Sequence, residues 1–156
     1  MKVFISHQQS DSEIAECIYD ELVCYRVGAY LDVFDTKLIS NSKELTNHIR
    51  GVVNQSSDIL VIMSEHTKQS WWVPFEIGMA SHQDLPIVTF LKQDLTLPEY
   101  LDYWPRLKSM NDIHKYIQVR KECLQESRKS LNSSVEYFSK RASRTELFYE
   151  KLKILL

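Results

Sequence analysis

Short apolar runs and amphipathic stretches alternate along the first two thirds of the chain. Residues 42–55 and 70–82 have the spacing of amphipathic helices, and so does the stretch with Ile14, Ile18, Leu22 and Val23. The apolar runs between them have the length of β-strands and cover residues 3–5, 29–33, 58–63 and 86–91. The run at 58–63 is apolar without alternation, as is typical of a strand covered on both faces.

This alternation predicts right-handed crossovers and a parallel sheet between two layers of helices. We therefore expect a flavodoxin-like, three-layer α/β fold with strand order 2-1-3-4 and a short fifth strand near Tyr103 and Trp104. Ligands of such sheets bind at the carboxyl ends of the strands, where the strand order reverses. Residues 6–10, residues 34–41 and the start of the helix at 70–82 should therefore surround one cleft.

After Pro105 the sequence becomes richer in charged residues and favours helices. We expect the α/β domain to cover residues 1–110 and a C-terminal helical extension, residues 111–156, to pack on the same domain. A charged, helix-favouring stretch covers 110–130, and residues 132–134 interrupt it. A further helix is predicted over 145–156, and its inward side chains would be Leu147, Phe148, Leu152 and Leu155.

Composition narrows the class of protein. The chain has 156 residues, 44% of them hydrophobic, which suits one globular domain. Its net charge of −2 argues against a nucleic-acid partner. Without a membrane-spanning run or a signal-peptide pattern, we expect a cytoplasmic protein with no membrane partner. Three cysteines without a CxxC pair are interpreted as buried free thiols: Cys17, Cys24 and Cys123.

Several kinds of chemistry have no sequence support. Three glycines in the whole chain cannot build a P-loop or a GxGxxG fingerprint, so a nucleotide would not bind as it does in a dehydrogenase. The five histidines show neither an HExxH motif nor another clustered metal-ligand spacing. We therefore predict no metal and no resident cofactor.

Glu76 is the strongest candidate for chemistry. If Ser70 caps the helix, Pro74 falls at the edge of the first turn, where a missing N–H costs little. Trp72 then lies one turn before Glu76 on the same face. The neighbours of Glu76 are mostly apolar, and a partly buried carboxylate is costly without a partner, which marks a site candidate. The residues alone leave open whether this glutamate is catalytic or structural.

Three segments together resemble a Toll/interleukin-1 receptor (TIR) domain. Residues 3–7, followed by Asp11, resemble the opening strand and loop of that family. Residues 30–35 resemble its second strand, and residues 70–80 its helix with a tryptophan four residues before a glutamate. Residues 57–64 also resemble its third strand. The resemblance covers about residues 2–105 and is closest to the short TIR proteins of bacterial anti-phage systems of the Thoeris type.

The resemblance implies an enzyme of the NAD glycohydrolase or ADP-ribosyl cyclase type. Glu76 would be the catalytic carboxylate that cleaves the nicotinamide–ribose bond of NAD, which is a substrate and not a cofactor. The substrate-binding residues would be Ser6, His7, Gln8, Asp35, Lys37 and Trp72. The loop at 35–42, which would carry two of them, lacks the glycine or proline common in the family.

The resemblance also implies self-association of TIR domains. The product would be a cyclic ADP-ribose-type molecule or an ADP-ribose conjugate that activates a separate effector protein. Two alternatives remain. A non-enzymatic adaptor would bind other TIR domains through exposed aromatic residues such as Trp71, Tyr100, Tyr103 and Trp104. A nucleoside or nucleotide transferase would use the same glutamate on deoxyribosyl substrates.

Overall fold

A five-stranded parallel sheet forms the centre of the protein, in the strand order β2-β1-β3-β4-β5. The computed structural model describes residues 1–31, 42–92, 95–97, 99–129 and 137–156. The predicted order 2-1-3-4 is therefore confirmed, and a fifth strand extends it. The strands are β1 (Lys2–Ser6), β2 (Gly28–Leu31), β3 (Asp58–Met63), β4 (Ile87–Leu91) and β5 (Arg106–Leu107).

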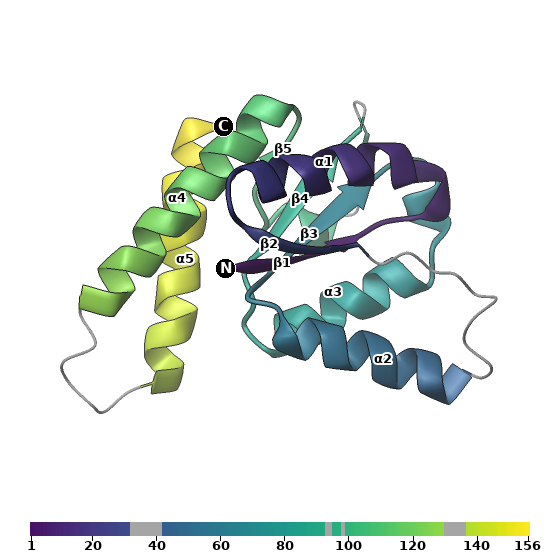
Figure 1. Cartoon of the computed structure of the whole chain (residues 1–156), viewed down its shortest axis with the longest axis horizontal. Helices are drawn as coiled ribbons and strands as arrows, with labels where there is room; N and C mark the ends of the chain where they lie inside the picture. The colour runs from purple at the N-terminus through teal and green to yellow at the C-terminus, as the bar shows by residue number, and fades with distance from the viewer. Residues whose placement is uncertain (32–41, 93–94, 98, 130–136) are drawn as a thin grey trace.

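Helices cover both faces of this sheet, which gives the predicted three layers (Figure 1). On one face lies α1 (Ser12–Cys24), which α4 (Met110–Lys129) contacts. On the other face α2 (Ser42–Gln55) packs beside α3 (Trp72–His82). The described connections contain three short 3-10 turns: η1 (Gln9–Asp11), η2 (Thr67–Gln69) and η3 (Glu99–Leu101).

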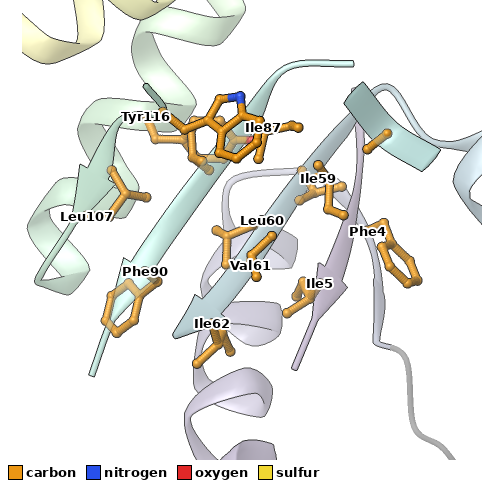
Figure 2. Close-up of a cluster of buried hydrophobic side chains, with 14 of the residues drawn as sticks. Phe4, Ile5, Ile59, Leu60, Val61, Ile62, Ile87, Phe90, Leu107 and Tyr116 are labelled. Carbon is orange, nitrogen blue, oxygen red and sulfur yellow. The ribbon is translucent and has the colours of Figure 1, made fainter. Parts of the chain in front are cut away.

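The core is centred on β3, whose six residues are all buried. Its neighbours β1 and β4 supply further large apolar side chains, such as Phe4 and Phe90 (Figure 2). The parallel register pairs Phe4 with Ile59 and Leu60 with Val88. Burial on both faces explains why this strand has no alternation of polar and apolar residues.

The two C-terminal helices belong to the same core. Helix α5 (Tyr137–Leu155) packs along α4, and its Phe148 and Leu152 are fully buried. The Tyr149 hydroxyl accepts a hydrogen bond of 2.8 Å from the backbone N–H of Ile87 in β4. Helix α5 begins at Tyr137, well before the predicted start at Thr145.

Several local predictions are wrong. The fifth strand lies at Arg106–Leu107 rather than near Tyr103, and Trp104 is buried against the core instead of exposed. Cys17 and Cys24 are exposed, because the inner stripe of α1 consists of Ala15, Ile18 and Leu22 and leaves both thiols off that stripe; only Cys123 is buried. Leu147 and Leu155 are also exposed, since α5 buries Phe148, Tyr149 and Leu152 instead. Among the described residues, no helix combines the length and the apolar character that crossing a membrane requires.

Candidate active site

Glu76 lies on α3, at the edge of the sheet where the strands end. The hydroxyl oxygen of Ser70 accepts hydrogen bonds from the backbone N–H groups of Trp72 and Val73, at 3.2 and 3.3 Å. Ser70 therefore accepts hydrogen bonds from two N–H groups of the first turn that have no partner within the helix. Pro74 is the third helical residue, a position in the first turn that the sequence predicts for it. Glu76 follows on the inner side of the helix and is 1% exposed.

The carboxylate of Glu76 meets β1. The hydroxyl of Ser6, the last residue of that strand, donates a hydrogen bond to Glu76 Oε2. Ser6 is itself fully buried and pairs with Val61 of β3, so its position is fixed by the sheet. The contact joins β1, which lies between β2 and β3, to α3. It therefore lies at the reversal of strand order where ligands of such sheets bind.

His7 and Gln8 continue from Ser6 into the first loop. His7 is buried, with Nδ1 at 3.4 Å from the carbonyl oxygen of Ile5 and Nε2 at 3.4 Å from the hydroxyl of Ser12. Burial lowers the pKa of His7, although the Ile5 carbonyl and nearby carboxylates act in the opposite direction. His7 is therefore neutral at pH 7 and offers a hydrogen bond rather than a positive charge. Gln8 is half-buried just before η1.

Of the three remaining predicted site residues, Trp72 is the one that the structure describes. Trp72 is half-buried one turn before Glu76, and its ring meets that of Phe75 edge-on at 5.7 Å between centroids. The predicted residues Asp35 and Lys37 lie outside the described residues. The structure thus brings Ser6 into contact with Glu76 and places His7 next along the chain.

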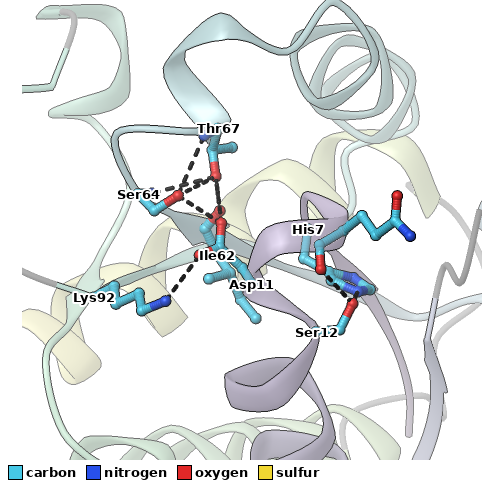
Figure 3. Close-up of polar contacts among 8 residues, drawn as sticks. His7, Asp11, Ser12, Ile62, Ser64, Thr67 and Lys92 are labelled. Atoms are coloured by element: carbon cyan, nitrogen blue, oxygen red, sulfur yellow. Dashed lines mark hydrogen bonds and ion pairs between the residues drawn. The ribbon is translucent and has the colours of Figure 1, made fainter.

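A buried polar network beside this site was not predicted from the sequence. Asp11, fully buried at the end of η1, accepts hydrogen bonds from Ser64 at 2.5 Å, Thr67 at 3.2 Å and Lys92 at 3.2 Å (Figure 3). These partners come from the segments that follow β3 and β4. Asp11 therefore ties together three loops at the same edge of the sheet. Nothing in the sequence indicates these contacts, because the partners of Asp11 lie more than 50 residues away.

A cavity of about 280 Å³ lies between α3 and the β4–β5 connection. Val73, Pro74 and Ile77 face it from the helix, and Leu97 and Tyr100 close it from the β4–β5 connection. Ser6 and Glu76 are not part of its wall. Within the described part of the chain, no cluster of three or more His, Cys, Asp or Glu side chains could hold a metal ion.

Comparison with models of protein families shows to which family this sequence belongs. The sequence model of the TIR domain matches residues 3–134, most of the chain. The protein belongs to the TIR domain family. This family includes NAD-cleaving enzymes as well as adaptors. Among curated proteins, no sequence relative matches the chain.

One solved structure shows the same fold, and a second match is weaker. The TIR domain of the Toll-related receptor TRR-2 from Hydra magnipapillata superposes with a TM-score of 0.60 at 14% identity, over 81% of this chain and 97% of that one. The TIR domains of the activated Roq1 resistosome, which directly recognizes the pathogen effector XopQ, match with a TM-score of 0.49 at 15% identity. That match covers 98% of this chain and 84% of the other. At such identities the likeness concerns the fold alone.

Proposed function

We propose that this TIR domain cleaves NAD at the nicotinamide–ribose bond, with Glu76 as the catalytic carboxylate. The observation that carries the proposal is the buried Glu76, which Ser6 holds by a hydrogen bond at the reversal of strand order. A buried carboxylate is costly, and a structure that keeps one where ligands bind favours a chemical role. Membership in the TIR family makes NAD the first substrate to test.

The reaction suits a single carboxylate. When the bond breaks, its electron pair leaves with the ring nitrogen, so nicotinamide departs as a neutral molecule and needs no strong acid. The ribose then carries positive charge like an oxocarbenium ion, which a nearby carboxylate stabilises. Attack by water gives ADP-ribose and a proton. Attack by an atom of the same molecule gives a cyclic isomer, and another nucleophile gives a conjugate.

The other predicted residues would bind the substrate. Ser6, which the resemblance assigns to substrate binding, would instead orient Glu76 through its hydroxyl. His7 and Gln8 would donate hydrogen bonds to ribose or phosphate oxygens. Trp72 would form a wall of the pocket for nicotinamide or ribose. Asp35 and Lys37 would contact the substrate from the following loop. No resident cofactor is needed for this chemistry.

The burial of Glu76 has a consequence for activity. At 1% exposure the carboxylate does not meet solvent, so the substrate reaches it only after a local rearrangement. Self-association of the domains, which the family resemblance implies, would supply the energy for such a change. We therefore expect slow cleavage by the isolated protein and faster cleavage after assembly. In a cell, the nucleotide product would activate a separate effector in a bacterial anti-phage response of the Thoeris type.

The test is product identification after incubation with NAD. The purified protein and its Glu76→Gln variant are compared at high concentration, with and without a phage lysate, by liquid chromatography and mass spectrometry. Nicotinamide release by the wild type alone supports the proposal, and the companion mass separates hydrolysis, cyclisation and conjugation. Parallel incubation with deoxynucleosides tests the transferase alternative. Intact NAD under activating conditions in both samples would contradict the proposal.

One observation favours the adaptor as a second candidate. Trp71 precedes α3 with 92% of its surface exposed, and Phe75 and Tyr100 are also exposed. Large exposed aromatic side chains are common anchors of protein interfaces. An adaptor would lose self-association in a Trp71→Ala variant and would not cleave NAD. An enzyme that works as an assembly would lose cleavage in the same variant and regain it at higher protein concentration.

A further inference from the structure

A second cavity lies at the opposite edge of the sheet. It has a volume of about 310 Å³, and its lining comes from residues just before β3 and β4 and from the two C-terminal helices. Its lining includes Ser57 and Pro86 from the sheet edge, Arg120 from α4 and Arg144 from α5. Ser6 and Glu76 lie at the carboxyl edge, so a ligand here would be separate from the proposed NAD site (Figure 1).

The described charges that line this cavity have one sign. Arg120 and Arg144 line it, and none of the other described lining residues carries a carboxylate. The nearest acidic side chains on α4 are engaged elsewhere, since Glu122 accepts a hydrogen bond from Gln118 and Glu126 pairs with Lys151. Arg144 makes no hydrogen bond or ion pair with any described residue. The cavity therefore contains a cation that has no counter-charge within the described chain.

Arg120 is held in a fixed position. Its Nε–H donates to the carboxylate of Asp58, the fully buried first residue of β3, and its guanidinium lies 5.4 Å from the centre of the Phe148 ring. The terminal amino groups of Arg120 make no hydrogen bond to a described residue. A guanidinium oriented in this way offers paired donors with little loss of side-chain entropy when a ligand binds.

The hydroxyl groups and the apolar residues of the wall narrow the chemical class of ligand that fits the cavity. Ser57 donates its proton to Asp58, and Ser56 donates to the carbonyl of Val52, so the arginines are the main donors. Pro86, Cys123 and Leu124 give part of the wall an apolar character. The geometry points to a binding site for a phosphate monoester of mononucleotide size, with the phosphate between Arg120 and Arg144 and the organic group against the apolar wall. Two guanidinium groups suit a phosphate because each can donate two parallel hydrogen bonds to its oxygens.

Titration calorimetry of the full chain tests this site, with inorganic phosphate, adenosine monophosphate and adenosine as probes. We expect saturable binding of one monophosphate per chain, weaker binding of phosphate and none of adenosine. Arg144→Ala should weaken monophosphate binding by roughly tenfold or more, because it removes a charged hydrogen-bond donor. This variant should fold, since Arg144 is half-buried and has no partner among the described residues to lose.

Two control variants test whether the monophosphate binds in this cavity. Lys108→Ala removes the same charge from an exposed position two residues before α4 begins, and it should bind the monophosphate normally. Leu124 lies about 21 Å along that helix from its first residue, Met110. Glu76→Gln should also bind normally, which keeps this test independent of the proposed NAD cleavage. No saturable binding of either phosphate probe, or equal affinity of the wild type and Arg144→Ala, would overturn the inference. Binding that Glu76→Gln alone abolishes would place the ligand at the other edge and also overturn it.

Discussion

The ion pair between Asp58 and Arg120 offers a quantitative test of how the C-terminal helices are joined to the sheet. Asp58 begins β3 with a fully buried side chain, and Arg120 reaches it from α4 with a side chain that is 12% exposed. We choose Arg120→Met, which replaces the aliphatic part of the side chain with an unbranched apolar one and removes the guanidinium group. The Asp58 carboxylate then keeps the hydroxyl of Ser57 as a hydrogen-bond donor but loses its guanidinium partner.

The expected loss is large. Removing one partner of a buried ion pair leaves an uncompensated charge and lowers the free energy of unfolding by roughly 3–5 kcal/mol. For a chain of this size that corresponds to a fall in Tm of about 6–20 °C. Replacing both partners, as in Asp58→Asn with Arg120→Met, removes the buried charge. The double variant should therefore be more stable than the single variant by roughly 2 kcal/mol or more.

The effect should depend on pH. Burial raises the pKa of Asp58, and Arg120 is the largest influence that opposes this rise. Without Arg120 the pKa rises further, so the folded state binds a proton more tightly than the unfolded state does. Stability then increases as pH falls through the raised folded pKa toward the ordinary value near ~3.9. The deficit of Arg120→Met should shrink over that range.

Urea unfolding followed by circular dichroism, at several pH values between 7 and 4, compares the wild type with the single and double variants. The reasoning is refuted if Arg120→Met loses less than about 1 kcal/mol at pH 7. It is equally refuted if the single variant is as stable as the double variant, or if its deficit stays constant across the pH range.

Three further predictions concern the site and the core. Ser6→Ala should lower kcat for NAD cleavage by roughly tenfold with little change in KM, because Ser6 orients Glu76; a change in KM alone would contradict this role. Asp11→Ala should lower the free energy of unfolding by about 1–3 kcal/mol in urea, because it removes the carboxylate acceptor of the buried Ser64 hydroxyl; unchanged stability would contradict the network in Figure 3. Leu152→Ala, at a fully buried position of α5, should cost about 2–5 kcal/mol, whereas Ile154→Ala, 83% exposed, should stay within about 0.5 kcal/mol; similar losses for both would show that α5 packs differently.

The periodicity of the sequence predicted the sheet well. Strands such as β3, which is apolar after its first residue, and amphipathic helices such as α2 give clear patterns. The crossover rule turns their alternation into a parallel sheet. The short β5 was misplaced because Arg106 and Leu107 are too few residues to show a pattern. The side chains of α5 were assigned partly to the wrong face, since both sides of that helix carry apolar residues.

The candidate site was predictable only in part. Glu76 could be singled out, because a carboxylate among apolar helical neighbours is unusual. Its contact with Ser6 depends on two segments 70 residues apart, and only the fold brings them together. The same holds for Asp11 and for the pairing of Asp58 with Arg120. Such long-range polar contacts have no local signal, so sequence reasoning missed them.

The central claim is that Glu76 cleaves NAD, and the initial rate of nicotinamide release tests it most directly. The wild type, Glu76→Gln and a matched control, Glu65→Gln, are assayed at equal concentration under assembling conditions, after circular dichroism shows that all three are folded. Glu65 is exposed and pairs only with Lys68 among the described residues, so its variant undergoes the same chemical change outside the site. We predict release by the wild type and Glu65→Gln, and a loss of at least about 100-fold in Glu76→Gln. Equal rates in all three proteins, or no release by any of them, would contradict the assignment.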